Sequence, residues 1–333
     1  MTHRTLGRAG VKVSRICLGT MMFGGPTPEE ESVAVIRAAL DAGINFLDTA
    51  DKYNQGESER VVGKAIRDCR DQVVLATKVG IAMGSGPNDA GTSRKHIRLA
   101  AEASLRRLGT EYIDLYYLHT FDASTPLEES LGALEDLVRA GKVLYAGCSN
   151  FWAWRVGQAL GIQELRGWDR LAAVQPLYNL ANRDVEVELL PMCAALGLGI
   201  VPYSPLARGV LTGKYSQGEA PPPDSRAARG NERLLQTEYR EANFALAGEL
   251  GALAAQVGCT PSQLALAWVL ANPLVTAPII GPRTMEQFRD NMGALWVELT
   301  PEVEAAIDAL VPPGEHSGKG YRDPAFPVAG RPT

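Results

Sequence analysis

The chain has 333 residues, of which 46% are hydrophobic and 21% are charged. These values are typical of folded globular proteins, and they exclude a disordered chain, a collagen-like chain and a coiled coil. A chain of this length buries enough surface to fold without a disulfide or a structural metal. The net charge of −5 leaves no basic excess for binding nucleic acid or an anionic membrane.

The five cysteines lie far apart, and no pair has Cys-x-x-Cys spacing. We therefore interpret them as small buried side chains of a protein in a reducing compartment. The N-terminal segment has no apolar stretch typical of a signal peptide, and no run reaches the length of about 18 apolar residues that a membrane span needs. We expect a cytoplasmic protein that does not use a membrane or a nucleic acid as a partner.

The first predicted elements are a hairpin and a strand. Arg4–Leu6 and Val11–Val13 are short runs on either side of a turn at Gly7–Gly10, which predicts two antiparallel strands. The next strand is expected at Arg15–Gly19.

Strands and helices then alternate along the chain. The sequence Thr27-Pro28-Glu29-Glu30 is typical of a capping box with proline at the first helical position, so a helix is expected to about Ala42, before Gly43. The later strands are predicted at Ile44–Leu47, Val73–Thr77, Ile113–Leu118, Val143–Gly147, Leu171–Val174, Ile200–Tyr203 and Val275–Ile280. The later helices are predicted at Glu57–Cys69, Ser93–Leu108, Leu127–Ala140, from Phe151 onward, and at Asp184–Leu196, Tyr239–Val257, Pro261–Ala271, Met285–Leu295 and Thr300–Leu310.

Strict alternation of strand and helix predicts parallel strands with helical crossovers. Eight such units favour an α/β fold of the closed (β/α)8 TIM-barrel type, with the N-terminal hairpin and the last helix as additions. The competing open nucleotide-binding sheet needs Gly-x-Gly-x-x-Gly after its first strand, and the sequence Gly19-Thr20-Met21-Met22-Phe23-Gly24 does not match it. We expect one domain over residues 1–333, with an irregular tail from about 312 to 333.

Polar or aromatic residues end or follow the second to the seventh of the eight predicted strands. They are Asp48 with Tyr53 in the loop after it, Lys78, His119, Ser149 and Asn150, Gln175, and Tyr203 with Ser204, while the eighth strand ends at Gly281. In a barrel of this type the active site lies at the carboxyl ends of the strands. Each of these residues alone could be a cap or a solvated end, but together they favour a site.

Asp48, Tyr53, Lys78 and His119 form a coherent chemical set. A tyrosine hydroxyl is a weak acid at neutral pH, and a lysine ammonium beside it favours the phenolate and lowers its pKa. An aspartate can pair with that lysine, and a histidine can orient a carbonyl oxygen by a hydrogen bond. The set predicts reduction of a carbonyl by hydride transfer, with tyrosine as the general acid.

The remaining strand ends suit a nicotinamide. Its carboxamide needs one acceptor and two donor partners, which Ser149, Asn150 and Gln175 can supply, and the ring of Tyr203 can stack on it. The four histidines lie far apart in the sequence, and we expect no metal site.

The stretch Leu47-Asp48-Thr49-Ala50-Asp51-Lys52-Tyr53, with Gly56-Glu57-Ser58-Glu59, resembles the signature of the aldo-keto reductase superfamily. The further marks of the resemblance are Lys78, His119, Ser149-Asn150, Gln175, the stretch Tyr203-Ser204-Pro205-Leu206-Ala207-Arg208-Gly209, and Lys214. It runs from the hairpin to about residue 296, and it is similar to the bacterial and potassium-channel β-subunit branch. It implies a barrel that uses NADP(H), with Tyr53 as acid, Lys78 and Asp48 as its tuners and His119 as the residue that orients the substrate.

The resemblance also implies a site for the cofactor. The segment Gly281-Pro282-Arg283-Thr284-Met285-Glu286-Gln287-Phe288-Arg289-Asp290-Asn291 is similar to the family's adenosine-phosphate motif. By this resemblance Arg283 and Gln287 hold the 2′-phosphate, and Asp290 and Asn291 contact the adenine. The cofactor set also includes Gly19, Thr20 and Met21, which end and follow the first strand.

Two other functions are weighed against a carbonyl reductase. A barrel lyase could use Lys78 as a Schiff base, but it would leave the Tyr203 stretch and Arg283 unused. A cofactor-sensing binding subunit would be expected to lack part of the proton-donor set, and all four residues are present, including the histidine that the channel subunits of the family lack. The substrate is a small carbonyl compound, and the sequence leaves aldehydes, ketones and keto-sugars open, together with the oligomeric state.

Overall fold

The structure is a computed structural model of the chain, and it describes residues 1–318 and 323–325. The chain divides into two compact units. The first comprises Met1–Pro176, Glu188–Tyr203 and Pro273–Arg289, and the second comprises Leu177–Val187, Ser204–Asn272 and Asp290–Thr333. The expectation of a single domain stays a prediction.

The first unit is built around eight parallel strands in the order β10-β3-β4-β5-β6-β7-β8-β9. They are β3 (Cys17–Gly19), β4 (Phe46–Asp48), β5 (Val74–Val79), β6 (Ile113–Leu118), β7 (Val143–Ser149), β8 (Ala173–Gln175), β9 (Gly199–Ile200) and β10 (Ile279–Ile280). The two end strands also meet, because the amides of Thr276 and Ile279 donate to the carbonyls of Ile200 and Pro202, each at 2.8 Å. The sheet therefore closes on itself, and the predicted (β/α)8 barrel is confirmed.

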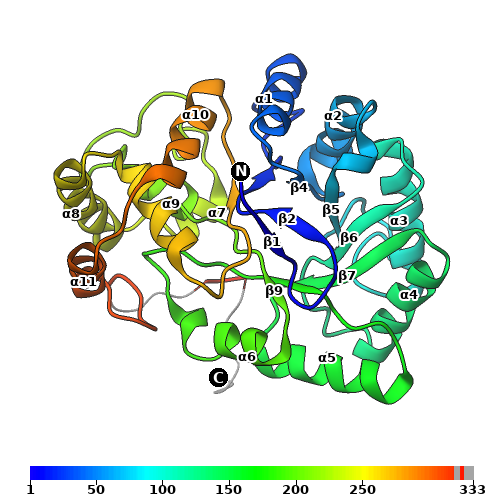
Figure 1. Ribbon diagram of the computed structural model, residues 1–333. Helices are drawn as coiled ribbons and strands as arrows, with labels where there is room; N and C mark the ends of the chain where they lie inside the picture. The colour runs from blue at the N-terminus through cyan, green and yellow to red at the C-terminus, as the bar shows by residue number, and fades with distance from the viewer. Residues whose placement is uncertain (319–322, 326–333) are drawn as a thin grey trace. The chain divides into compact units, whose positions relative to one another are not determined.

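Helices of the first unit lie around the outside of this sheet (Figure 1). They are α1 (Glu29–Asp41), α2 (Glu57–Ile66), α3 (Arg94–Leu108), α4 (Leu127–Arg139), α5 (Ala153–Arg166) and α6 (Leu189–Leu196). Helix α10 (Met285–Gly293) follows β10 and begins in this unit. The inside of the barrel is filled by strand side chains such as Phe46, Leu115 and Tyr117, all without exposed surface, so the barrel is a packed core.

The N-terminal hairpin, formed by β1 (His3–Thr5) and β2 (Lys12–Ser14), covers the amino ends of the strands. The amide of Arg8 donates to the carbonyl of Gly197 just before β9, at 2.9 Å. The amide of Ser14 donates to the side chain of Asn45 just before β4, at 2.7 Å. Because the hairpin covers this end, the carboxyl ends of the strands are left for a site.

The second unit is helical. It contains α7 (Glu232–Gln236), α8 (Glu241–Val257), α9 (Pro261–Ala271) and α11 (Pro301–Leu310). Helix α9 begins with a capping box in which Thr260 and Gln263 bond each other's backbone amides. Within residues 1–318 and 323–325 no single helix is long and apolar enough to cross a membrane. Helices α8 and α9 taken together reach the length and apolar composition of a span, but they are bent by 87° relative to each other.

Three local predictions are wrong. Thr27 does not cap α1: Pro28 is the N-cap and has no side-chain cap bond, while the Thr27 hydroxyl donates to the carbonyl of Arg283 at 3.1 Å. The helix expected at Asp184–Leu196 is a short 3-10 turn followed by α6, and α7 lies in a segment expected to have none. Of the tail expected to be irregular, residues 319–322 and 326–333 lie outside the described residues.

Candidate active site

Neighbouring strands deliver the predicted polar residues to one end of the barrel. Asp48 ends β4, Lys78 lies one residue before the end of β5, and His119 directly follows β6. The next strand, β7, ends at Ser149, whose register partner is Gln175 at the end of β8. Because the strands are parallel and adjacent, these side chains gather at the carboxyl end of the first unit.

Lys78 lies at the centre of this group and has no exposed surface. Its ammonium has three N–H donors, and each has an acceptor: Asp48 Oδ1 at 2.5 Å, the carbonyl of Thr49 at 2.7 Å and Tyr53 Oη at 3.3 Å. Burial acts to lower the pKa of Lys78, but the carboxylate of Asp48 and the hydroxyl of Tyr53 outweigh it, so that pKa is raised. The ammonium is therefore charged at neutral pH and lies against the tyrosine hydroxyl.

Asp48 is held from three sides. Its second carboxylate oxygen accepts a hydrogen bond from Gln175 Nε2 at 2.8 Å, and its carbonyl accepts from the amide and the hydroxyl of Thr20 at 2.9 and 3.1 Å. Ser58 Oγ lies 2.8 Å from Thr20 Oγ1 and 2.9 Å from Thr49 Oγ1. Thr20, placed by the sequence in the cofactor set, thus fixes the end of β4 in this structure.

The neighbours of Thr20 also have local partners. A Cβ on Gly19 would lie 2.5 Å from Cγ2 of Ile279, so glycine lets β3 and β10 approach each other. The carbonyl of Met21 accepts a hydrogen bond from the side-chain Nδ2 of Asn54 at 3.1 Å.

Tyr53 sits on a constrained turn. The two residues after it, Asn54 and Gln55, have φ of 49° and 56°, in the left-handed region that non-glycine residues seldom adopt. The Asn54 amide stabilises this turn, because it donates to the carbonyls of Met21 and Phe23. The turn thereby fixes the backbone from which the phenol reaches Lys78.

His119 lies beside Tyr53, with ring centroids 6.0 Å apart and ring planes almost perpendicular at 83°. Burial, followed by the charge of Lys78, lowers the pKa of His119 to about 3. The imidazole is therefore neutral at pH 7, and can offer a hydrogen bond without adding a positive charge.

Ser149, Asn150, Gln175 and Tyr203 form one hydrogen-bonded network. The Asn150 amide donates to the carbonyl of His119 at 2.9 Å and to Ser149 Oγ at 3.0 Å, and its oxygen accepts from the Tyr203 hydroxyl at 2.8 Å. Ser149 Oγ donates to the carbonyl of Gln175 at 2.8 Å. After these bonds the group still offers acceptor positions on Asn150 and Gln175, which fit the amide protons of a carboxamide.

The stretch Ser204–Gly209 and Lys214 belong to the second unit. The backbone of this stretch is left-handed at Ser204, Ala207, Arg208 and Gly209, with φ between 47° and 95°. A Cβ on Gly209 would lie 2.8 Å from Lys214 Nζ, so the ammonium passes directly over this glycine. Backbone amides in left-handed turns beside a cation such as Lys214 are typical of an anion-binding cradle.

The start of α10 holds the last predicted group. The side-chain oxygen of Gln287 accepts from the amide of Arg283 at 2.9 Å, and Thr284 Oγ1 accepts from the amide of Gln287 at 3.2 Å, so both side chains cap the helix. Gly281, directly after β10, is exposed. Asp290 and Asn291 belong to the second unit, where Asp290 Oδ1 accepts from Thr260 and Gln263, and Asn291 is buried.

Buried acidic residues near the site had no role assigned from the sequence. Glu59, part of the recognised signature, has no exposed surface and accepts hydrogen bonds from Thr77 Oγ1 and Arg107 Nε, each at 2.6 Å. Asp51 is also fully buried, and burial, reinforced by the charge of Glu59, raises its pKa to about 7. Both residues lie in the recognised signature, which was the available signal, but only the fold shows that their carboxyl groups are buried.

A family profile described as "Aldo/keto reductase family" matches residues 15–312. The chain belongs to this family. It is 42% identical to "Uncharacterized oxidoreductase YrpG" of Bacillus subtilis, over 96% of this chain and 99% of that protein. It is 38% identical to "Probable voltage-gated potassium channel subunit beta" of Oryza sativa, over 97% of this chain and all of that protein. It is also 38% identical to "Probable aldo-keto reductase 1" of Glycine max, over 95% of this chain and 90% of that protein.

As an aldo/keto reductase, the protein is an oxidoreductase that acts on carbonyl groups. The sequence resemblance is thereby confirmed at the level of the family.

Proposed function

We propose that this aldo/keto reductase reduces aldehyde or ketone carbonyls of small molecules to alcohols, with NADPH as the hydride donor and Tyr53 as the general acid. The observation that carries the proposal is the position of the Lys78 ammonium, which contacts both the Tyr53 hydroxyl and the Asp48 carboxylate. A buried cation at this place favours the phenolate and makes the hydroxyl proton easier to release.

The chain's own residues supply the proton side of the reaction. NADPH, when bound, supplies a hydride to the carbonyl carbon. As negative charge builds on the carbonyl oxygen, Tyr53 gives its hydroxyl proton to that oxygen, and the alcohol forms. The phenolate left on Tyr53 is stabilised by Lys78, whose charge is in turn balanced by Asp48. Tyr53 regains its proton from solvent before the next turnover.

The neutral imidazole of His119 positions the substrate in this scheme. It lies edge to face with the Tyr53 ring, and its pKa of about 3 keeps it uncharged over the working pH range. A neutral ring can hydrogen bond to the carbonyl oxygen without competing with Tyr53 as a proton source at pH 7.

Each part of the cofactor has a group of residues that suits it. The network of Ser149, Asn150, Gln175 and Tyr203 has acceptor positions for the amide protons of a nicotinamide carboxamide. The left-handed stretch Ser204–Gly209, beside Lys214, suits the pyrophosphate.

The adenosine end of the cofactor is assigned to α10 and its start. Arg283 and Gln287 suit the 2′-phosphate, since amides at a helix start favour anions and Arg283 adds a positive charge. Asp290 and Asn291, further along α10, are proposed for the adenine, and Gly19 and Met21 complete the set.

A Schiff-base lyase is disfavoured by the surroundings of Lys78. Such an enzyme needs an accessible amine that can lose its proton. Lys78 has no exposed surface, its three donors are occupied, and its pKa is raised. The second alternative is a cofactor-sensing subunit, which the names of the channel-subunit relatives favour. It would bind NADPH through the same residues but would show no turnover.

NADPH oxidation in the presence of simple aldehydes tests the proposal. We expect Tyr53→Phe to reduce turnover by about 100-fold or more, as for loss of a general acid, with little change in NADPH affinity. The matched control is Tyr116→Phe, since the buried Tyr116 hydroxyl has no hydrogen-bond partner among the described residues. Turnover that survives in Tyr53→Phe would remove this residue from the mechanism, and NADPH binding without turnover by the wild type would favour the sensing subunit.

A further inference from the structure

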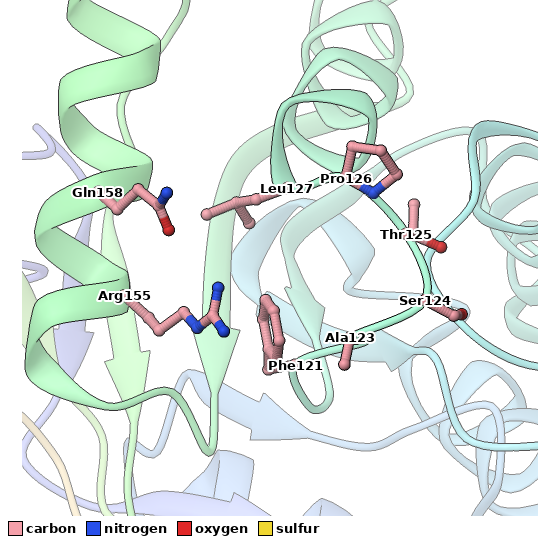
Figure 2. Close-up of a pocket in the computed structure, with 8 residues that line it drawn as sticks. All are labelled: Phe121, Ala123, Ser124, Thr125, Pro126, Leu127, Arg155 and Gln158. Atoms are coloured by element: carbon pink, nitrogen blue, oxygen red, sulfur yellow. The ribbon is translucent and has the colours of Figure 1, made fainter. Parts of the chain in front are cut away.

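A pocket of about 350 Å³ lies in the first unit between helix α5 and the loop that joins β6 to α4 (Figure 2). Phe121 and Leu127 form apolar parts of its lining, and Arg155 and Gln158 extend toward it from α5 (Figure 2). The volume falls within the range of about 300–1,000 Å³ that small-molecule sites have. None of the residues assigned above to catalysis or cofactor binding lines it.

Arg155 lies against two aromatic rings. Its guanidinium carbon lies 3.7 Å from the centroid of the Phe121 ring and 4.1 Å from that of Trp154. Arg166, on the same helix, pairs with Glu128, whereas Arg155 has no ion pair within the described part of the chain. Its Nε is buried and, among those same residues, has no hydrogen-bond partner. Stacking fixes the plane of the guanidinium and leaves the N–H groups on its edge to bind an anion.

The acidic residue of this loop is already satisfied. Asp122 Oδ1 accepts from the amide and hydroxyl of Ser124, and Oδ2 accepts from the hydroxyl of Thr125 and the amide of Thr92. Burial acts against ionisation, but these bonds outweigh it and lower the pKa of Asp122 to about 2. Asp122 therefore does not pair with Arg155, and the hydroxyl protons of Ser124 and Thr125 are already donated. Among the described side chains that line the pocket, Arg155 and Gln158 remain as donors.

Phe121, which lines the pocket, lies close along the chain to one of the strand ends that carry the carbonyl site. β6 and β7 are paired, with Leu118 opposite Cys148. Phe121 follows His119 by two residues, which limits their Cα atoms to a separation of about 7 Å. From β7, Phe151 directly follows Asn150 and packs against Phe121 with ring centroids 5.7 Å apart. A molecule whose carbonyl lies at Tyr53 and His119 can therefore extend along these two strand ends toward Arg155.

We propose that this pocket binds a carboxylate at the far end of the substrate. A planar carboxylate matches the edge of a guanidinium with two parallel hydrogen bonds. One guanidinium balances its single charge, and Gln158 can add a neutral bond. Phe121 and Leu127 suit the apolar carbon chain that joins the carboxylate to the carbonyl. The inference rests on the proposed carbonyl reduction and defines its substrate class as oxo-carboxylates.

Kinetics with paired aldehydes test the proposal. Straight-chain aldehydes that end in a carboxylate are compared with aldehydes of equal length that end in a methyl group, over increasing chain lengths. At the best length, kcat/KM is expected to favour the carboxylate by about tenfold or more, as one charge-assisted pair provides. Arg155→Gln should remove most of this preference for the carboxylate. Arg155→Lys should keep only part of it, because a lysine cannot form the two parallel hydrogen bonds of a guanidinium. The control Arg166→Gln should leave the ratio unchanged.

A binding measurement without cofactor separates the pocket from the reaction. Trp154 contacts Arg155, so benzoate titrated into the protein should change tryptophan fluorescence saturably, and Trp154→Phe identifies the reporting ring. Arg155→Gln is expected to weaken benzoate binding by about tenfold or more. Equal benzoate binding by wild type and Arg155→Gln, or an unchanged kcat/KM ratio, would overturn the inference. If no aldehyde is reduced, the proposed function fails, and the oxo-carboxylate class fails with it, while the benzoate titration still decides whether Arg155 forms an anion site.

Discussion

Replacing Asp51 by Asn should make the protein more stable at neutral and alkaline pH. The Asp51 side chain is fully buried beside Glu59, and burial first, then the charge of Glu59, raises its pKa to about 7, against the opposing effects of Arg107 and Lys78. In the unfolded chain an aspartate ionises near pH 4. Between about pH 4 and pH 7 the folded protein therefore keeps a proton that the unfolded chain has lost.

The sign and size of the effect follow from this difference. Where the folded state binds more protons, the free energy of unfolding falls as the pH rises. A difference of about 3 between the two pKa values corresponds to about 4 kcal/mol. The free energy of unfolding falls by this amount between about pH 4 and pH 7, and this loss stays constant above pH 7. Asparagine carries no charge in either state, so Asp51→Asn should not show this loss.

Urea unfolding at pH 5 and pH 8 provides the assay. The stability advantage of Asp51→Asn over the wild type should widen by about 3 kcal/mol between these two values. The control is Asp71→Asn, because Asp71 is exposed and its replacement should have the same effect at both values. An Asp51→Asn advantage that does not change with pH would refute the reasoning, because it would show that Asp51 is ionised in the folded protein.

Three further predictions concern the site. The fall of the wild-type rate at high pH should report the coupled titration of Tyr53 and Lys78, and Lys78→Met should abolish turnover and remove this fall from the residual rate. A residual rate that falls at the same high pH would argue against the coupling. Wild type should bind NADPH at least about tenfold more tightly than NADH, and Arg283→Ala should erase most of that preference, as judged by fluorescence titration; equal loss for both cofactors would make Arg283 structural. Ser58→Ala should lower stability by about 1–3 kcal/mol in thermal unfolding, because the buried groups of Thr20 and Thr49 lose their partner.

The barrel could be predicted from the sequence because its signal is local and repeated. Each strand is a short apolar run before a helix with one buried face, and Ile113–Leu118 was expected with the bounds that β6 has. Parallel strands place their carboxyl ends together whatever the details of the helices. The grouping of Asp48, Lys78 and Gln175 at one end of the sheet follows from that rule alone.

The parts that could not be predicted depend on partners distant in the sequence. Thr27 has the local pattern of a helix cap, but its hydroxyl bonds to a carbonyl 256 positions away. Ser58 links Thr20 and Thr49, and nothing near it in the sequence indicates either contact. Arg155 reads as an ordinary helix-surface arginine until the fold brings Phe121 against it. Such contacts require three-dimensional distances, which spacing along the chain does not give.

The length over which neighbouring strands are paired differs around the barrel. β6 and β7 are paired over the length of Ile113–Leu118, whereas β9 and β10 have two residues each and meet through a few backbone hydrogen bonds near Ile200 and Pro202. This gives the barrel a seam. Local opening starts where the fewest backbone bonds must break, so amide protons beside the seam should exchange with solvent before those of the long strands. On its other side β10, the last strand of the barrel, pairs with β3, the first, so the ring can close only after almost the whole barrel sequence has been made.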